Sequence, residues 1–173
     1  MCTIYVHMHQ LQAQLSRYPA ADMARRFDSE TLGAWRGFLN AHAQITRRIN
    51  RDLAAHDLPD LAWYDLLWAL YRQPERRLRV NELAREVVLS PTAMSRFVDR
   101  VEKAGCVRRE PDPADRRALQ IVITDAGVDL LQRMWPIYAD GIEAHFMTHL
   151  GRSPASVRRM FERMAESARD SQP

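Results

Sequence analysis

The sequence predicts an all-α fold that carries one small β-hairpin. Most of the chain places apolar residues at the spacing of amphipathic helices, i, i+3, i+4 and i+7. Within this helical background, a helix-turn-helix pattern spans Asn81 to Gly105. Two runs with strand character, 106–110 and 118–123, follow it and are separated by turn residues. The remaining helical segments lie before and after this central part.

The first segment, residues 1–27, has two interpretations. A few apolar residues lie at helical spacing before Pro19, so the segment is either an added helix or a frayed N-terminal arm. From about Ser29 we expect a long helix that ends at Asp57, because the residue before Pro59 and its neighbours avoid the helical region. Its apolar side follows near-heptad spacing through Leu32, Trp35, Leu39, His42, Ile45 or Thr46, and Ile49.

A second amphipathic helix is expected to end near Gln73–Pro74, before a polar loop. Its apolar residues are Trp63, Leu66, Leu67, Leu70 and Tyr71. Residues 78–80 have the character of a short strand that would lie beside the hairpin.

The helix-turn-helix carries its own start and stop signals. Ser90 is suited to cap the second helix, and Pro91 fits the first helical position because its missing N–H is not needed there. Gly105 supplies the left-handed residue that ends this helix. The first helix has an apolar stripe of Leu83, Ala84, Val87 and Val88, and the second buries Met94, Phe97, Val98 and Val101.

The opposite face of the second helix is polar. Short hydroxyls and an arginine near the start of a helix suit the reading of base edges in a major groove, so Thr92, Ser95 and Arg96 are the first candidates. Arg100 and Lys103 would contact phosphates. Asp99 would either orient a neighbouring arginine or accept from a cytosine amino group. The alternative is a solvated helix face without a partner. With Ser90 and Pro91, these residues form the predicted DNA-binding set on this helix.

The hairpin has Arg116 and Arg117 at or just after its tip. Its second run has apolar residues at the alternate positions 119, 121 and 123. A helix-turn-helix followed by such a hairpin is a winged helix, and its wing would place a guanidinium group in a minor groove. Which of the two arginines does so stays open.

The C-terminal part predicts two more helices. Thr124 would cap a long one, Pro136 would kink or divide it, and Gly151 would close it. Ser153–Pro154 starts the last helix, whose apolar stripe includes Met160 and Met164. Since a single winged domain cannot cover so much apolar surface, we expect helices 28–57 and 125–170 to interlock with a partner chain.

From about Leu58 to Gly127 the chain resembles the MarR family of bacterial transcriptional regulators. The residues that carry the resemblance are Tyr64–Leu67, Glu82–Ala84, Ser95–Glu102, Arg108–Glu110, Asp112–Arg117 and Ile123–Gly127, in this order and spacing. The resemblance implies a winged helix-turn-helix at 58–124, a homodimer, and a near-palindromic operator in double-stranded DNA. It also implies a cytoplasmic, nucleoid-associated regulator, typically a repressor released by a small aromatic or anionic effector. In the wing, Asp115 and Arg117 match a family pair, in which Asp115 would brace an arginine. The alternative is a surface ion pair of ~0–1 kcal/mol.

The effector site is predicted mainly from the resemblance. Asp65, Arg96 and Arg109 lie where the urate-responsive branch keeps three pocket residues. That branch also uses a tryptophan from an added N-terminal helix, and no tryptophan precedes Trp35 here. An aromatic or phenolic effector is therefore favoured over urate. His42, Trp63 and Tyr64 would line the cleft, unless they are ordinary core residues.

Composition restricts the remaining classes. The net charge is +3, Lys103 is the only lysine, and two cysteines, Cys2 and Cys106, form no metal or disulfide pattern, which favours a reducing compartment. There is no apolar run long enough for a membrane span and no signal-peptide pattern at the N-terminus.

No cofactor, metal or enzymatic activity is expected. His145 and His149 are spaced i, i+4 but lack a third ligand, and we find no phosphate loop, zinc-protease motif or catalytic triad. Two alternatives remain beside the ligand-responsive regulator: a winged-helix adaptor that binds protein without an operator, and a redox- or metal-responsive regulator.

Overall fold

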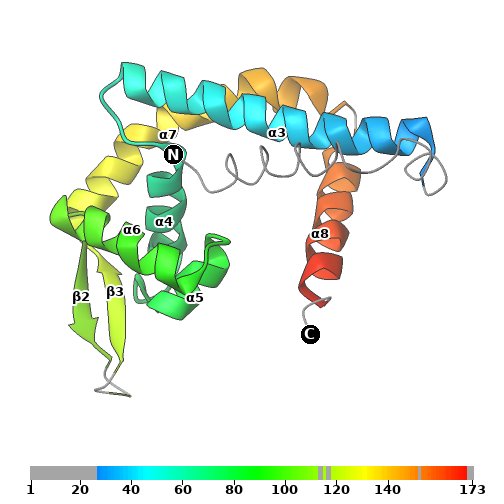
Figure 1. Cartoon of the computed structure of the whole chain (residues 1–173). Helices are drawn as coiled ribbons and strands as arrows, with labels where there is room; N and C mark the ends of the chain where they lie inside the picture. Colours follow the sequence, from blue (N-terminus) through cyan, green and yellow to red (C-terminus); the bar gives the residue numbers. More distant parts are fainter. Residues whose placement is uncertain (1–26, 113–114, 116–117, 152, 171–173) are drawn as a thin grey trace. The chain divides into compact units, whose positions relative to one another are not determined.

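The structure, a computed structural model, describes residues 27–112, 115, 118–151 and 153–170. The chain divides into two compact units, 1–44 and 45–173, with the boundary inside helix α3 (Ser29–Ala55). The choice between helix and arm for the N-terminal segment lies outside the described residues. The predicted fold class is confirmed: the described part is mostly helical, with one small antiparallel sheet (Figure 1).

In the first unit, the described residues form the start of α3. The Asp28 carboxylate accepts a hydrogen bond from the Thr31 N–H at 2.6 Å, so Asp28 caps the helix. This bond and a second one from the Thr31 hydroxyl lower the pKa of Asp28. Trp35 and Phe38 stack on each other, with ring centroids 5.8 Å apart, and both are exposed in the single chain.

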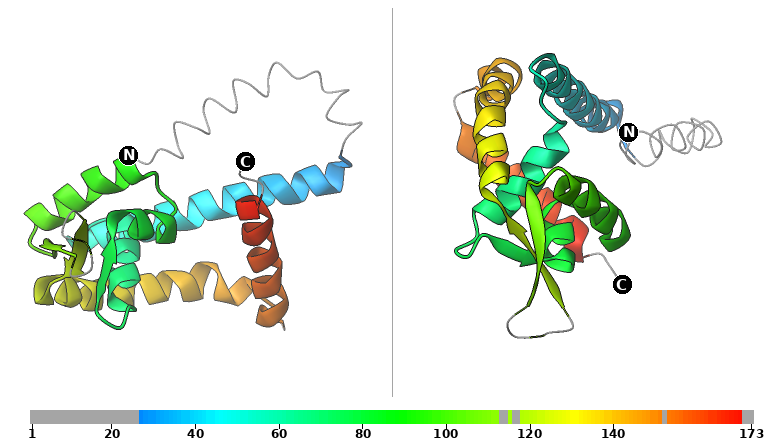
Figure 2. Two further views of the ribbon diagram at one scale, coloured as in Figure 1. Left: turned by 90° about the horizontal axis from the view of Figure 1, so that it is seen from below. Right: turned by 90° about the vertical axis from the view of Figure 1, so that its left-hand side faces the viewer.

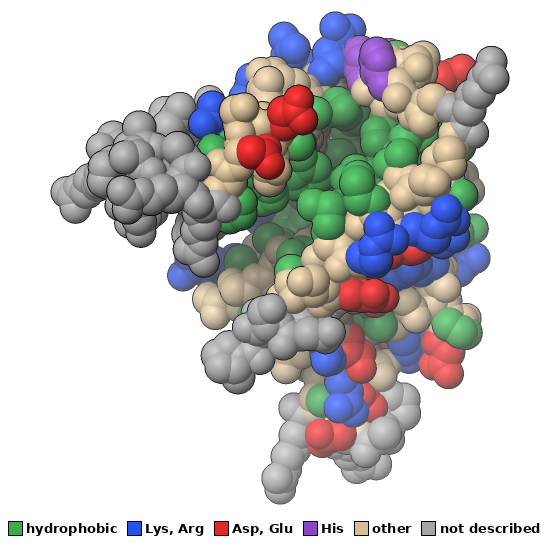
Figure 3. All heavy atoms as spheres, turned by 90° about the vertical axis from the view of Figure 1, so that its right-hand side faces the viewer, with side chains coloured by type: hydrophobic (Ala, Val, Ile, Leu, Met, Phe, Trp, Pro, Cys, Tyr) green, Lys and Arg blue, Asp and Glu red, His purple; other side chains and the backbone are tan. Residues whose placement is uncertain are grey.

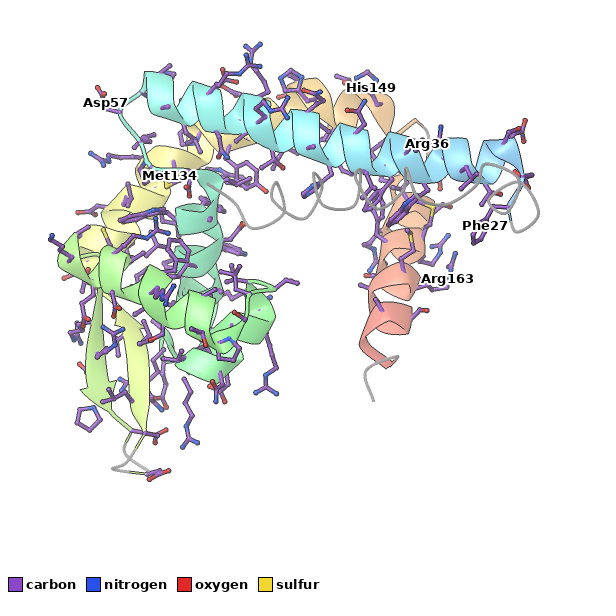
Figure 4. The ribbon with its side chains drawn as sticks, viewed as in Figure 1. Phe27, Arg36, Asp57, Met134, His149 and Arg163 are labelled. Carbon is purple, nitrogen blue, oxygen red and sulfur yellow. The ribbon has the colours of Figure 1, made fainter. Side chains whose placement is uncertain are left out.

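In the second unit, the end of α3 packs with α4 (Leu61–Tyr71) and α7 (Asp125–His145). After α3 the chain turns at Asp57, which has a φ of 54° (Figure 4). The Asn50 side chain then accepts from the Leu61 N–H at 2.7 Å, which attaches the start of α4 to α3. The core between these helices includes Ile49, Leu53, Leu66, Leu67, Leu70 and Met134, all of them buried.

The helix-turn-helix consists of α5 (Val80–Glu86) and α6 (Pro91–Lys103). Three strands, β1 (Arg77–Arg79), β2 (Val107–Pro111) and β3 (Leu119–Ile123), form an antiparallel sheet in the order β1-β3-β2. The short strand expected before α5 is therefore confirmed, shifted by one residue. We call residues 107–123 the wing; its two strands run side by side in the right-hand view of Figure 2.

One prediction about an apolar pattern was wrong. Val88 does not belong to the buried stripe of α5: it is 88% exposed and has a φ of 54°, because the turn into α6 requires a left-handed residue there. In β3, Leu119 is exposed and Val122 is buried. Leu119 pairs only with Pro111 at the outer end of the wing, whereas Val122 lies between Arg77 and Arg108 in the middle of the sheet.

The C-terminal helices also differ from expectation. Helix α7 continues through Pro136 without the expected division and ends at His145. A short 3-10 helix, η1 (Met147–His149), comes before Gly151, so His145 and His149 do not lie on one regular helix (Figure 4). Helix α8 (Pro154–Asp170) follows. None of the helices in the described ranges combines the length and apolar character needed to cross a bilayer.

Candidate functional site: the exposed face of α6 and a cavity between α4 and α7

Local signals build helix α6 as expected. The Ser90 Oγ accepts from the Ala93 N–H at 3.2 Å, and Pro91 occupies the first turn. Gly105, after the last turn, has a φ of 76°. Since Met94, Phe97, Val98 and Val101 are all buried, the rotation of the helix about its axis is determined, and so is the face that it presents outward.

That outward face is polar and basic. Thr92, Ser95, Arg96, Arg100 and Lys103 are all exposed. Within the described part of the chain, Arg96 and Lys103 have no hydrogen bond or ion pair, so their donors are available to a partner. The Arg100 guanidinium lies over the Phe97 ring, 5.1 Å from its centroid.

One edge of α6 is attached to the wing by Arg109. Its guanidinium donates to Asp99 at 2.5 Å and also pairs with Glu102. The Arg109 N–H adds a hydrogen bond of 2.9 Å to Glu102. Of the two roles considered for Asp99, orientation of a neighbouring arginine is the one found. These ion pairs hold the recognition helix against β2.

A second attachment joins the wing to the start of α5. The Arg79 Nε donates to the Asp112 carboxylate at 2.6 Å, and Asp112 is the one buried charged side chain among the described residues. This pairing raises the pKa of Arg79 further above its usual value. Asp115 is exposed, whereas Arg116 and Arg117 lie outside the described residues. Sequence reasoning missed the Arg79–Asp112 pair because the two residues are far apart in the chain.

A cavity of about 610 Å³ opens between α4 and α7. Its walls are mainly aromatic: the Tyr64 and Tyr138 rings meet edge to face at 4.8 Å, and the Tyr64 and Trp135 rings stack at 6.1 Å. The lining residues are Tyr64, Asp65, Trp68, Tyr71, Val128, Leu131, Gln132, Trp135, Tyr138 and Ile142.

Asp65 is the one charged residue in this lining. Burial among neighbouring atoms, with a smaller contribution from Asp60, raises the pKa of Asp65 to about 6, although part of its surface stays exposed. Burial likewise raises the pKa of Tyr64 to about 12, with smaller effects of Tyr138 and Asp65. Within the described residues, no cation pairs with the Asp65 carboxylate.

The structure brings only part of the expected effector site to this cavity. Tyr64 and Asp65 line it. Trp63 instead contacts Phe97 edge to face at 6.3 Å, and Arg109 points to α6. His42 belongs to the first unit, and neither it nor Arg96 is a lining residue. Sequence reasoning missed Trp68, Trp135 and Tyr138, although the spacing of aromatic residues along each helix was a usable signal.

Two further features bear on redox and metal chemistry. Cys106 is buried, and this burial raises the pKa of its thiol, with Arg133 acting in the opposite direction. A buried thiol with a raised pKa is a poor nucleophile toward an oxidant. In the described ranges, no three His, Cys, Asp or Glu residues come together as a metal site would need.

Comparison with known proteins identifies relatives for this architecture. A family model described as the MarR family matches residues 56–118. Among curated proteins, the HTH-type transcriptional repressor IacR of Pseudomonas putida is 27% identical over 148 residues, which cover 86% of this chain and 82% of IacR. The transcriptional regulator HosA of Escherichia coli O157:H7 is 31% identical, over 61% of this chain and 76% of HosA.

Solved structures agree with these matches. Sco3205, a MarR family transcriptional regulator from Streptomyces coelicolor determined in complex with DNA, superimposes with a TM-score of 0.74 and 31% identity, over 85% of this chain and 91% of that one. AbsC, a MarR family regulator from the same organism, superimposes with a TM-score of 0.77 and 26% identity, over 84% of this chain and 98% of AbsC.

Proposed function

Because this chain belongs to the MarR family of transcriptional regulators, whose members are not enzymes, we propose that it is a homodimeric repressor released from its operator by a small effector. The family assignment itself makes it a transcriptional regulator that binds DNA. Dimerisation, repression, the operator and the effector are the parts that we propose. In the cell, such a repressor would act on nucleoid DNA in the bacterial cytoplasm.

The outward face of α6 is the observation that carries this proposal. It holds Arg96 and Lys103 without partners in the described chain, above a completely buried opposite face. We assign base contacts to Thr92, Ser95 and Arg96, and phosphate contacts to Arg100 and Lys103. Arg116 or Arg117 would enter the minor groove from the wing, with Asp115 beside them. The similarity to Sco3205, whose structure contains DNA, supports this assignment.

Exposed apolar side chains support a dimer. Large apolar residues rarely stay exposed in clusters on a soluble monomer, and Figure 3 shows many at the surface. The proposed dimerisation segments 28–57 and 125–170 include α3, η1 and α8. A second copy of the chain would cover the exposed apolar side chains of these three elements, which are Trp35, Phe38, Leu39, Met147, Met160 and Met164. Two copies of α6 would then reach half-sites about 34–36 Å apart, which implies a near-palindromic operator.

The cavity between α4 and α7 supports the effector. Its volume of about 610 Å³ lies in the range of small-molecule sites, about 300–1,000 Å³. Helix α4 also contacts α5, which supports α6 in the helix-turn-helix. A ligand in the cavity would therefore contact α4, the helix that packs against α5 of the helix-turn-helix. We propose the repressor role by analogy with IacR, a relative that is a transcriptional repressor.

Binding measurements on DNA test the proposal. The protein is footprinted on its own upstream DNA, and its affinity for the protected site and for random duplex is measured at several salt concentrations. We expect a protected near-palindrome and affinity that falls steeply with salt. A winged-helix adaptor that binds only protein would show neither a preferred site nor a steep salt dependence, and that result would overturn the proposal.

A further inference from the structure

We propose that the cavity between α4 and α7 takes a positively charged aromatic compound, such as an arylalkylamine, rather than an aromatic acid. The inference rests on the proposed effector role of this cavity and specifies the chemistry of the effector. Three features of the cavity carry it: the aromatic walls, the single carboxylate, and the state of the neighbouring cations.

The walls suit a flat cation. Tyr64, Trp68 and Tyr71 come from α4, and Trp135 and Tyr138 come from α7. The Trp68 and Tyr71 rings stack at 5.9 Å, and Trp135 and Tyr138 meet edge to face at 6.2 Å. The faces of such rings attract cations, and they also stack on an aromatic ligand.

The only charge in the cavity lining is negative. Asp65 is its only ionisable group apart from the tyrosines, and the described lining contains no lysine, arginine or histidine. The carboxylate of an aromatic acid would lie beside the Asp65 carboxylate without a cation to balance it. An ammonium group in the same position would instead form a charge-assisted hydrogen bond, which is stronger than a bond between neutral groups.

Two arginines lie beside lining residues of this cavity. Arg72 lines a smaller neighbouring cavity together with Asp65, but its guanidinium is ion-paired with Glu86 of α5. The Arg76 guanidinium lies over the Tyr71 ring, 4.7 Å from its centroid. The second contact shows that the ring of one lining residue accepts a cation. Arg72 is neutralised by its ion pair and Arg76 is not a lining residue, so neither guanidinium is placed to balance an acidic ligand inside the cavity.

The ionisation of Asp65 fits this ligand class. Its pKa is raised to about 6, so near neutral pH the carboxylate is charged although its neighbours favour the neutral form. A bound cation would favour the charged form and lower that pKa again. Tyr64 and Tyr138, which interact with Asp65, have raised pKa values and so stay neutral in this range. The neighbouring carboxylate of Asp60 adds negative charge, which a bound cation would also offset.

The experiment compares aromatic ligands of similar size that carry a positive charge, a negative charge or none. Binding is measured by isothermal titration calorimetry at pH 7.5 with tryptamine, neutral indole and indole-3-acetate, and also with phenethylamine and phenylacetate. We expect each amine to bind at least about tenfold tighter than the matching acid, which corresponds to ~1.4 kcal/mol. Asp65→Asn should remove this preference and leave the affinity for indole unchanged.

Asp129→Asn is the matched control, because Asp129 is an exposed aspartate of α7 that does not line the cavity. It should keep the preference for amines. If Asp65→Asn fails to fold, Trp135→Leu tests the aromatic wall instead, and it should weaken tryptamine binding more than indole-3-acetate binding. Acids that bind as tightly as amines, amine binding that does not depend on either substitution, or no amine binding at millimolar concentration would overturn the inference.

A gel-shift assay with operator DNA separates the inference from the proposed function. Amines that bind with the expected charge preference but do not release DNA would overturn the effector role and leave the ligand class standing. Release of DNA by acids alone would overturn the ligand class and leave the effector role standing.

Discussion

Gly127 shows how one residue joins two parts of the helix-turn-helix region. A Cβ atom at this position would lie 2.1 Å from the Cys106 carbonyl oxygen and 2.8 Å from the Ile123 side chain. The neighbouring Thr124 hydroxyl donates to the Gly105 carbonyl at 2.6 Å and accepts from the Gly127 N–H at 3.1 Å. The first turn of α7 is thus held against the residues that end α6.

Gly127→Ala should destabilise the protein by about 1–3 kcal/mol, because the added methyl group overlaps backbone that cannot move freely. A glycine-to-alanine change within a helix normally stabilises by about 0.4–1 kcal/mol, so the sign of the effect is diagnostic. The measurement is thermal unfolding at a fixed chain concentration. An unchanged or higher Tm would show that α7 does not pack so closely on Cys106.

Asp65 gives the protein a predictable dependence of stability on pH. Its pKa in the folded protein, about 6, is above its usual value. Between these two values the folded state binds more protons than the unfolded state, so this group's contribution to stability falls as pH rises through 6. Asp65→Asn should therefore raise the Tm relative to wild type at pH 7–8, with the difference disappearing near pH 4. A constant difference across this range would contradict the raised pKa.

Arg96 and Lys103 should affect DNA binding in different ways. Arg96→Ala should weaken binding to the preferred site by about 1–3 kcal/mol more than binding to random duplex, since a base contact is lost. Lys103→Ala, on the same exposed face, should weaken both equally and reduce the salt slope by about 1, as expected for a phosphate contact. Equal losses on both DNAs for Arg96→Ala would limit Arg96 to phosphate binding.

Among the elements, the wing is attached to the rest of the second unit at two places. Arg109 of β2 pairs with Asp99 and Glu102 of α6, and Arg79 before α5 pairs with the buried Asp112 at the end of β2. All three ion pairs join segments that the proposed function requires to meet DNA together. The wing therefore has a defined orientation relative to the recognition helix, which a hairpin attached only by its strands would lack.

Arg79→Met should lower stability by about 2 kcal/mol, because it leaves the carboxylate of Asp112 buried without its guanidinium partner. It should also weaken DNA binding through the wing. Arg108→Met is the control, since its partner Glu110 is 31% exposed where Asp112 is 3% exposed, and exposed pairs contribute ~0–1 kcal/mol. Urea unfolding at one chain concentration measures both variants. A similar decrease in the free energy of unfolding for both variants would show that the burial of Asp112 does not make its ion pair more important for stability.

At the scale of the whole molecule, the main observation is that the single chain leaves large apolar side chains exposed to solvent. In α3, Trp35 is 52% exposed, and Met147 of η1 is 58% exposed. Each of the long terminal helices is amphipathic, but in the single chain part of its apolar side faces solvent. A protein with this surface is stabilised by association, so its stability and its affinity for a two-half-site operator should both depend on chain concentration.

Trp35→Glu should weaken the proposed dimer, because it places a carboxylate where a large apolar group would be covered. The molar mass measured by light scattering during gel filtration should shift toward one chain on dilution, and operator binding should fall with it. Asn40→Glu, which adds the same group at an exposed polar position of α3, should have little effect. A wild-type protein that runs as a single chain at all concentrations would remove the basis for the two-half-site operator.

Much of the helix-turn-helix could be predicted from local sequence. Ser90, Pro91 and Gly105 mark the bounds of α6, and the periodicity of its apolar residues determines which side is buried. The turn at Val88 was not predictable in this way, since valine rarely adopts a positive φ and only the packing of α5 against α6 requires it. Similarly, Pro136 was expected to kink or divide α7; the helix is not divided there, and it packs against the core on both sides of Pro136.

By itself, the sequence determined most of the helices, the caps Ser90 and Thr124, the buried face of α6 and the family, because these depend on residues within a few positions of one another or on a linear motif. Only the tertiary structure decided which aromatic rings of α4 meet those of α7, that Arg109 turns to α6, and that Arg79 reaches Asp112. Such contacts join residues between about 7 and 70 positions apart. They form because the shared core brings their helices and strands together, and no local rule specifies that arrangement.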